Sequence, residues 1–167
     1  MKYSIKPITP KNAQEISSWA YDPPYERYDM SADHIQGLLN PDYRYHVVFN
    51  GDQILVGFCC FGEDARVPGG SYSIIEPKIL DVGVGMHPKF TGQGLGWEFV
   101  GFILDYTFQS FRPKIFRVTV AAFNQRSLKT FKSLGFIETH SFFHDLVEIK
   151  FIQLERPVNV EVSNDLQ

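Results

Sequence analysis

Hydrophobic and polar residues change their spacing several times along this chain, and each change predicts a new secondary-structure element. Apolar and β-branched runs with a period of two indicate strands, whereas apolar residues three and four positions apart indicate helices. We predict helices that begin near Thr9, Ser31, Gly94 and Asn124. We predict strands over residues 3–7, 43–50, 53–61, 80–86, 115–121, 136–143 and 147–154.

Turn-forming residues separate these elements and set some of their connections. Asn50-Gly51-Asp52 lies between two strand-like runs and predicts a tight antiparallel hairpin. Residues 62–78 are polar and contain Gly and Pro, which predicts either a loop at the rim of a site or a mobile hairpin tip. Gly135 follows the fourth helix in the position of a left-handed cap. We predict one domain over residues 1–156 and a polar, disordered tail over 157–167.

The composition favours a single globular domain and argues against several classes of function. The 167 residues are 44% hydrophobic, which is enough to bury one core. A net charge of −3 without a basic cluster disfavours nucleic-acid binding. No apolar run is long enough to cross a membrane, and the N-terminus lacks the features of a signal peptide. Adjacent Cys59 and Cys60 point to opposite faces of a strand and cannot crosslink, so we expect a cytoplasmic protein.

The strand over 80–86 leads into a glycine-rich turn and then a helix, an arrangement typical of phosphate-binding sites. Gly92, Gly94 and Gly96 leave the backbone accessible, and the unpaired amides of the helix face the turn. The spacing differs from G-x-G-x-x-G and no Lys-Ser or Lys-Thr pair follows, so neither a dinucleotide site nor a P-loop is predicted. An ordinary strand-to-helix turn is the alternative interpretation of these glycines.

Two motifs resemble those of one enzyme superfamily. Thr91, Gly94 and Gly96 stand in the slots of motif A of the GNAT acyl-CoA-dependent N-acyltransferases: Gln or Arg, two residues, Gly, one residue, then Gly or Ala. The segment Asn124 to Phe136 resembles the family's motif B. The resemblance covers roughly residues 3–156 and implies an α/β (α+β) fold. Its sheet is mixed and mostly antiparallel, with about six or seven strands, a splayed central parallel pair and about four helices.

The resemblance also implies that acetyl-CoA binds as a cosubstrate, with no metal. Amides of the glycine-rich turn would hold the diphosphate, and the pantetheine arm would follow residues 84–86 with the Met86 amide as the oxyanion donor. Gly83 and Gly85 mark where a bulge would open the strand ladder. The implied cofactor-binding residues are Val84, Gly85, Met86, Thr91, Gly92, Gln93, Gly94, Leu95, Gly96, Trp97, Asn124, Arg126 and Phe131.

Acyl transfer to an amine needs a proton acceptor, because an amine with a pKa of about 10.4 is mostly protonated at neutral pH. We predict a carboxylate near the cleft. The candidates are Asp81 on the central strand, Glu63 and Asp64 after the preceding strand, and His87. For each of them, a surface charge or turn former is an equally good interpretation.

Two positions depart from the family pattern. Thr91 replaces the usual Gln or Arg, which backbone amides can compensate. Phe131 stands where many members carry a tyrosine that protonates the leaving thiolate, and it has no proton to give. A thiol with a pKa of about 8.5 can leave without acid help. The alternative proton donors are Tyr72, Tyr25 and His144.

The acceptor is the least defined partner. Residues 19–28 place aromatic and charged side chains between the first two helices, where this superfamily shapes its acceptor pocket. We predict an acetyltransferase that moves the acetyl group of acetyl-CoA to a primary amine, of a small molecule or a peptide N-terminus, by direct attack in a ternary complex. The alternatives are an acyl-CoA-binding module with little or no activity and a mononucleotide-binding protein. The family also makes a homodimer an option, with residues 147–154 as the candidate pairing edge.

Overall fold

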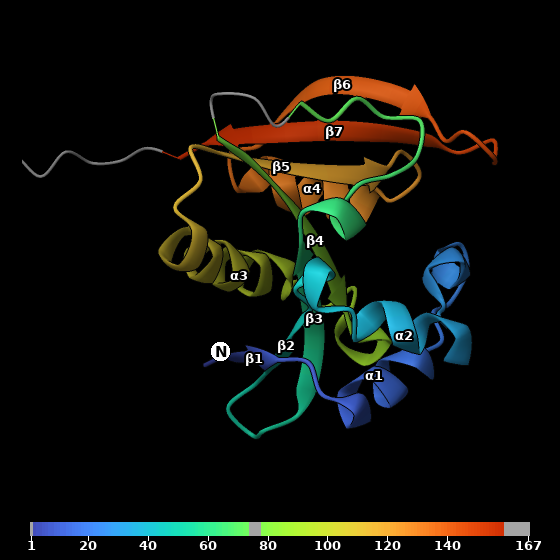
Figure 1. Ribbon diagram of the computed structural model, residues 1–167, viewed down its shortest axis with the longest axis vertical. Helices are drawn as coiled ribbons and strands as arrows, with labels where there is room; N and C mark the ends of the chain where they lie inside the picture. The colour runs from blue at the N-terminus through green and yellow to red at the C-terminus, as the bar shows by residue number, and fades with distance from the viewer. Residues whose placement is uncertain (1, 74–77, 159–167) are drawn as a thin grey trace, which may run out of the picture.

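The computed structural model describes residues 2–73 and 78–158 and forms one mixed, seven-stranded sheet. The strands run in the order β1-β2-β3-β4-β5-β7-β6 (Figure 1). Only β4 and β5 pair in parallel among the described strands, so the predicted fold class is confirmed. Their bounds are β1 Ser4–Pro7, β2 His46–Phe49, β3 Leu55–Phe61, β4 Ile79–Met86, β5 Ile115–Ala121, β6 Ile137–Phe143 and β7 Lys150–Pro157.

The described residues contain four α-helices, each close to where the sequence predicts one. Thr9 caps α1 in a reciprocal capping box with Asn12. The Ser31 region begins with a 3-10 turn, Ala32–His34, so α2 is only one turn long. Gly135 has a φ of 86° just after α4, the left-handed conformation that ends a helix. The bounds are α1 Pro10–Ser17, α2 Ile35–Leu38, α3 Gly96–Phe111 and α4 Gln125–Ser133.

The hairpin predicted at Asn50-Gly51-Asp52 joins β2 and β3 as antiparallel neighbours. The Asn50 side chain holds the turn, because its Oδ1 accepts hydrogen bonds from the Asp52 and Ile54 amides at 3.1 and 3.0 Å. Phe49 pairs with Leu55, so the turn spans residues 50–54 and is wider than a two-residue loop. Asn50 can be buried because its side-chain oxygen is paired with backbone donors.

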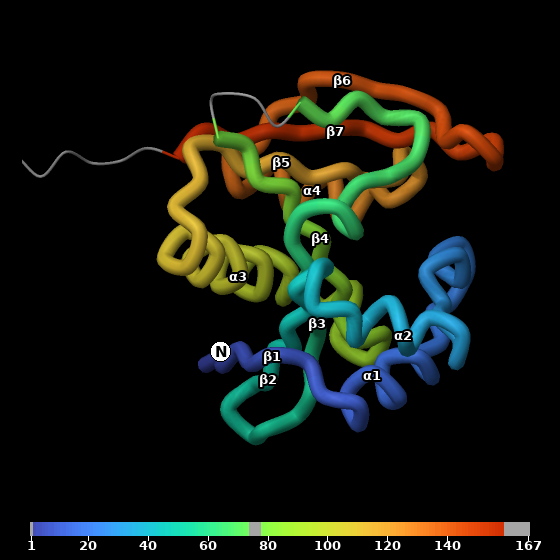
Figure 2. Tube along the Cα trace, viewed as in Figure 1, coloured from blue at the N-terminus to red at the C-terminus, as the bar shows by residue number. Residues whose placement is uncertain are grey.

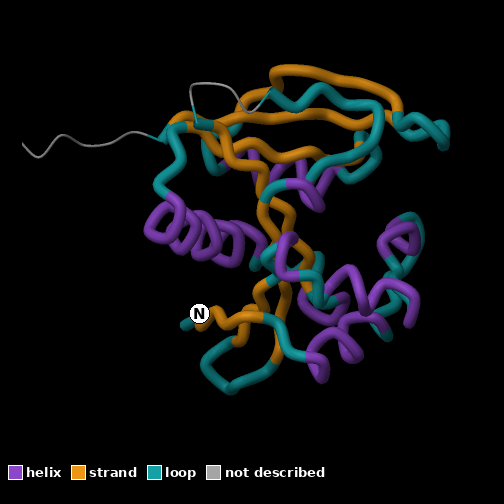
Figure 3. Tube along the Cα trace, in the orientation of Figure 1, coloured by secondary structure: helices purple, strands orange, loops and turns teal. Residues whose placement is uncertain are grey.

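Helices cover both faces of the sheet (Figures 1 and 2). On one face, apolar residues of α3 and α4, such as Phe99 and Leu128, pack with Val82 and Val118. On the other face, Ile16 of α1 and Leu38 of α2 join a separate cluster. Figure 3 shows the helices on either side of the central strands. The part of the chain that the structure describes has no helix long and apolar enough to span a membrane.

The last two strands correct part of the sequence interpretation. Residues 144–149 form the connection, with the His144 amide bonded to the Ile149 carbonyl at 3.0 Å, so β7 begins three residues later than predicted. β7 lies between β5 and β6, and β6 is the edge strand. Residues 147–154 are therefore not a pairing edge, because periodicity does not specify strand order. β7 reaches Pro157, and residues 159–167 of the predicted tail lie outside the described residues.

Candidate active site

The parallel strands β4 and β5 separate near the middle of the sheet. They pair only at Ile79, Leu80 and Asp81 of β4, opposite residues 115–117 of β5. Beyond that point β4 continues to pair with β3 as far as Met86, while β5 pairs with β7 as far as Ala121. The edges of β4 and β5 that face each other are thus left open over residues 82–86 and 118–121. We call this opening the split.

Backbone groups of β4 point into the split. The Gly62 amide bonds to the Asp81 carbonyl and the His87 amide bonds to the Val56 carbonyl, both at 2.9 Å. Bonded and non-bonded pairs alternate in an antiparallel ladder, so the N–H and C=O groups at the intervening even positions of β4 face away from β3. These positions are Val82, Val84 and Met86. The split therefore has a row of backbone donors and acceptors along its β4 side.

Gly83 and Gly85 accommodate side chains of β3 rather than a bulge. A Cβ on Gly85 would lie 2.2 Å from the Phe58 ring, and one on Gly83 would lie 2.7 Å from the Cys60 sulfur. The β3–β4 ladder runs in constant register through both glycines. β4 therefore stops pairing with β5 after Asp81 without a bulge in the β3–β4 ladder. The two glycines leave room for side chains of β3 to lie across β4.

The glycine-rich turn brings the start of α3 to the end of β4. Gly92 and Gly94 have φ of 72° and 76°, a region that favours glycine. The N-cap position of α3, Leu95, has no side-chain cap. The first-turn amides and the positive end of the helix dipole are consequently available to an anion. The Thr91 hydroxyl donates to the Pro88 carbonyl at 2.8 Å, so this side chain stabilises the turn itself.

The beginning of α4 packs against this turn. A Cβ on Gly96 would lie 3.0 Å from Thr130 Oγ1, and a Cβ on Gly92 would lie 3.2 Å from Arg126 Nη1. Asn124 caps α4 by accepting the Ser127 amide at 3.1 Å. Gly96 therefore permits close helix packing, and the Arg126 guanidinium lies beside the turn.

Phe131, further along α4, belongs to the core. It is buried and packs edge-to-face against Phe136, with ring centroids 5.2 Å apart. The ring position that carries a hydroxyl in many GNAT members is here part of an aromatic pair. The site residues predicted here thus have three different places: Arg126 lies beside the turn, Asn124 caps α4, and Phe131 packs inside.

Asp81 lies at the point where the strands separate, but it is bound by two arginines. Arg117 donates to both of its carboxylate oxygens, from Nε at 2.6 Å and Nη2 at 2.8 Å, and Arg66 Nε donates at 2.9 Å. Asp81 is only 1% exposed. Both oxygens of this carboxylate are occupied by guanidinium donors, so this geometry favours a structural role.

The other carboxylates predicted near the cleft occupy a 3-10 turn, Glu63–Ala65, that follows β3. This turn packs on β4, because a Cβ on Gly83 would lie 3.4 Å from the Ala65 Cβ. Glu63 and Asp64 are both exposed, and Asp64 accepts a hydrogen bond from the Tyr45 hydroxyl. Burial raises the pKa of the neighbouring Cys60 thiol to about 12, so this cysteine is protonated and unreactive at neutral pH.

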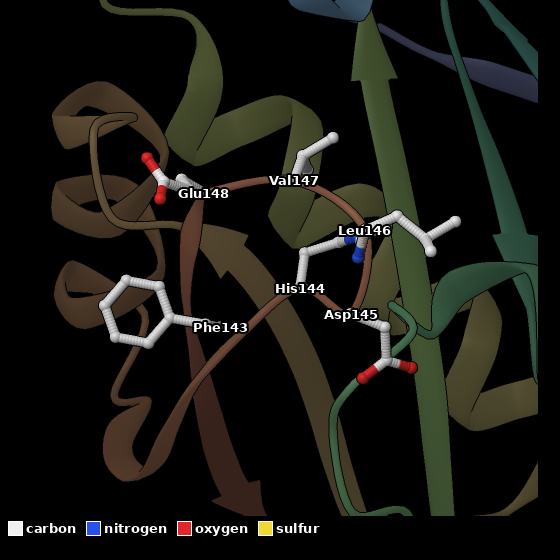
Figure 4. Close-up of a pocket in the computed structure, with 6 residues that line it drawn as sticks. All are labelled: Phe143, His144, Asp145, Leu146, Val147 and Glu148. Atoms are coloured by element: carbon white, nitrogen blue, oxygen red, sulfur yellow. The ribbon is translucent and has the colours of Figure 1, made fainter.

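His87 and the alternative proton donors have separate environments. The His87 ring packs on Trp19 with centroids 4.7 Å apart, and its Nδ1 accepts the Lys89 amide at 3.0 Å. The Tyr72 hydroxyl accepts the Val67 amide at 2.8 Å and lies 3.0 Å from Thr119 Oγ1 on β5. His144 lies in the β6–β7 connection, where residues 143–148 form a shallow hollow (Figure 4). This hollow contains none of the residues predicted to bind the cofactor.

The segment between α1 and α2 contacts both sides of the site. The Tyr21 hydroxyl donates to the Met86 carbonyl at 2.8 Å, which confirms that this carbonyl faces away from β3. Asn124 Nδ2 donates to the Tyr28 hydroxyl at 3.1 Å. Tyr25 and Tyr28 pack against Phe123, with centroids 6.2 and 5.9 Å away. Sequence reasoning overlooked Phe123, and its place directly before the Asn124 cap was the available signal.

Burial raises the pKa of the Tyr21 hydroxyl, with smaller contributions from Asp29 and Tyr28. This hydroxyl is therefore a hydrogen-bond donor throughout the physiological pH range.

Among the residues that the structure describes, no cluster of three or more His, Cys, Asp or Glu side chains is placed to hold a metal ion.

A family model described as the Acetyltransferase (GNAT) family matches residues 11–136. The chain belongs to the GNAT acetyltransferase family. Solved GNAT structures resemble it over nearly their whole length at low sequence identity, which shows a shared fold. No curated protein matches this GNAT chain in a sequence search.

Two of these solved structures share the fold of this chain but are named for different acceptors. A chimera of the Vibrio cholerae spermidine N-acetyltransferase SpeG and hSSAT is 17% identical, with a TM-score of 0.71 over 94% of this chain and 96% of that one. A protein assigned as a phosphinothricin N-acetyltransferase is 13% identical, with a TM-score of 0.69 over 95% and 100%. Both support the GNAT fold and leave the acceptor of this chain open.

Proposed function

We propose that this GNAT protein transfers the acetyl group of acetyl-CoA to a primary amine by direct attack in a ternary complex. The observation that carries the proposal is the open edge of β4. The glycine-rich turn and the uncapped N-terminus of α3 follow it in the chain. Backbone donors and acceptors along residues 82–86 suit the amides of a pantetheine arm, and the start of α3 suits a diphosphate. The two features are consecutive in the chain, as the two parts of acyl-CoA are.

The turn residues fit the charge and size of a diphosphate. Gly92 and Gly94, both at positive φ, have no side chains that would keep an anion from the backbone, and the Arg126 guanidinium supplies a cation. Bound acetyl-CoA would supply the activated acetyl group. The residues proposed to hold it are the amides of 92–97 for the diphosphate, Val84, Gly85 and Met86 for the arm, and Thr91, Asn124, Arg126 and Phe131 around them.

In the proposed reaction the amine nitrogen forms a bond to the thioester carbonyl carbon, and the carbon–sulfur bond breaks. The Met86 amide faces the split and would donate to the oxyanion. Because Asp81 is bound by two arginines, we propose Glu63, on the turn that packs against Gly83, as the carboxylate that takes the amine proton through water. The sulfur leaves as thiolate, which a thiol pKa of about 8.5 permits without an acid at Phe131.

The direct test measures the release of free thiol from acetyl-CoA across a panel of amines, which should include spermidine, phosphinothricin, amino acids and peptides with free N-termini. We expect amine-dependent thiol release together with calorimetric binding of CoA. If CoA shows no measurable affinity, the proposal is overturned. Protection against heat by ATP but not by CoA would indicate a mononucleotide site instead.

Phe131 specifically favours a second candidate, an acyl-CoA-binding module with little or no catalysis. Its ring is buried against Phe136, so no acid is available at the usual position. Tight CoA binding without thiol release above background across the amine panel would support this module.

We also propose that residues 1–156 act as one acyltransferase domain in the reducing cytoplasm, which the two free, buried cysteines support. A homodimer is a further proposal. A spermidine N-acetyltransferase from Vibrio cholerae, 17% identical with a TM-score of 0.65 over 93% of both chains, is described as dodecameric, so assembly occurs on this fold. Light scattering on the purified protein would give the mass in solution, and a monomer mass would exclude the dimer.

A further inference from the structure

The Arg126 side chain lies between the glycine-rich turn and the segment that connects α1 and α2. Its Cζ is 3.8 Å from the centroid of the Tyr25 ring. Its Nη1 also lies close to Gly92, where an added Cβ would be only 3.2 Å away. Arg126 is otherwise exposed, and an exposed arginine samples many rotamers. Contacts with the ring and the turn favour one location for this side chain.

The Tyr25 ring is itself held by other aromatic side chains. It stacks on Tyr28 with centroids 6.5 Å apart and packs on Phe123 at 6.2 Å. Tyr28 is fixed by the hydrogen bond from Asn124, the residue that caps α4. Tyr25 is therefore held in place by its neighbours, two of which, Phe123 and Asn124, directly precede the helix that carries Arg126.

We propose that Tyr25 is a positioning residue that holds the Arg126 guanidinium over the glycine-rich turn, so that it binds a phosphate group of acyl-CoA. The inference rests on the proposed function, because it assigns a role within the same site. A guanidinium that packs on an aromatic face keeps its N–H donors free, because they point outward in the plane of the guanidinium itself. These donors can then bind a phosphate. The segment assigned to the acceptor thus contributes to cofactor affinity through a side chain that does not touch the cofactor.

The expected size of this effect is modest, because a partly exposed cation–π contact is weak. Calorimetric titration with CoA should show an affinity about two- to fivefold lower for Tyr25→Leu than for the wild type. Tyr25→Phe should bind CoA like the wild type, because it keeps the ring face. The thermal unfolding midpoint of each variant controls for folding.

A double-mutant cycle separates positioning from a general structural effect. Arg126→Met should weaken CoA binding about tenfold or more, as expected for loss of a charge-assisted contact. Adding Tyr25→Leu to Arg126→Met should then cause no further loss. In contrast, Tyr25→Leu should add its full loss to Lys89→Met, a matched change of a second cation near the turn. The Tyr25→Leu loss should also shrink between about 50 and 300 mM KCl, because salt screens the phosphate contact.

The outcomes distinguish this inference from the proposed function. Wild-type protein without CoA affinity overturns the proposed function. Wild-type binding with an unchanged Tyr25→Leu affinity, or with equal losses in the presence and absence of Arg126, overturns the positioning role alone.

Discussion

Asp81 and His87 both belong to β4 or its end, and the sequence presents both as candidate bases. Burial gives them different properties. Asp81 is enclosed with Arg117, on the neighbouring strand β5, and with Arg66, which follows the 3-10 turn Glu63–Ala65. His87 lies beside Trp19 and keeps one ring nitrogen occupied by the Lys89 amide. For a single residue, the groups that surround a titratable side chain decide its role more than the kind of amino acid does.

Asp81→Asn should destabilise the protein by about 3–5 kcal/mol, because it leaves the buried Arg117 guanidinium without its counter-charge. Urea denaturation measures the loss. Glu63→Gln, at an exposed carboxylate, is the matched control and should change stability by less than about 0.5 kcal/mol. A stable Asp81→Asn variant that loses turnover would instead identify Asp81 as the base.

His87 should make the protein less stable in mild acid. Burial, the largest cause, lowers the pKa of His87 below its ordinary value of 6.5; Glu15 opposes this shift and Lys89 adds to it. The unfolded chain then binds the proton more readily, so the contribution is present above pH 6.5 and is lost as the pH falls through the lowered pKa. Urea midpoints at about pH 7.5 and about pH 5.5 should differ less in His87→Asn than in the wild type. An equal difference in both would contradict this assignment.

The glycine-rich turn shows how an element depends on backbone conformation. Gly94 has a φ of 76° and no atom within 4 Å of an added Cβ. Gly37, in α2, also has open space around an added Cβ, but it lies in a helix. The two positions therefore differ in conformation and not in crowding.

This pair gives a matched prediction. Gly94→Ala should destabilise the protein by about 1–2 kcal/mol and weaken CoA binding, because alanine disfavours positive φ. Gly37→Ala should stabilise it by about 0.4–1 kcal/mol, because the unfolded chain loses freedom. Denaturation and CoA titration of both variants provide the measurement. Equal effects would mean that conformation is not the cause.

At the scale of the whole molecule, the described strands form two groups, β1–β4 and β5–β7, joined by pairing at Ile79, Leu80 and Asp81. The core on the α3 and α4 face crosses this junction, since Val56, Val82, Phe116 and Leu154 belong to one cluster. Continuous packing over a narrow junction allows the split to remain open while the two groups behave as one unit.

We therefore expect a single cooperative unfolding transition. In a Trp97→Phe background, the fluorescence of buried Trp19 reports on the α1 face, and far-ultraviolet circular dichroism reports on all helices and strands. The two urea midpoints should coincide. An earlier transition in fluorescence would show that the α1 face opens separately.

The sequence determined the elements and the family. The hairpin at Asn50-Gly51-Asp52, the helix starts at Thr9 and Asn124, and the glycine-rich turn depend on residues a few positions apart, so local patterns identify them. The same local patterns carry the two GNAT motifs.

Only the tertiary structure decided how distant segments meet. Asp81 and Arg117 are 36 residues apart, and Tyr28 and Asn124 are 96 apart. No local pattern specifies such contacts, because they arise when strands and helices pack together. The burial of Asp81, the interior place of β7 and the stacking of Arg126 on Tyr25 therefore became visible only in the folded chain.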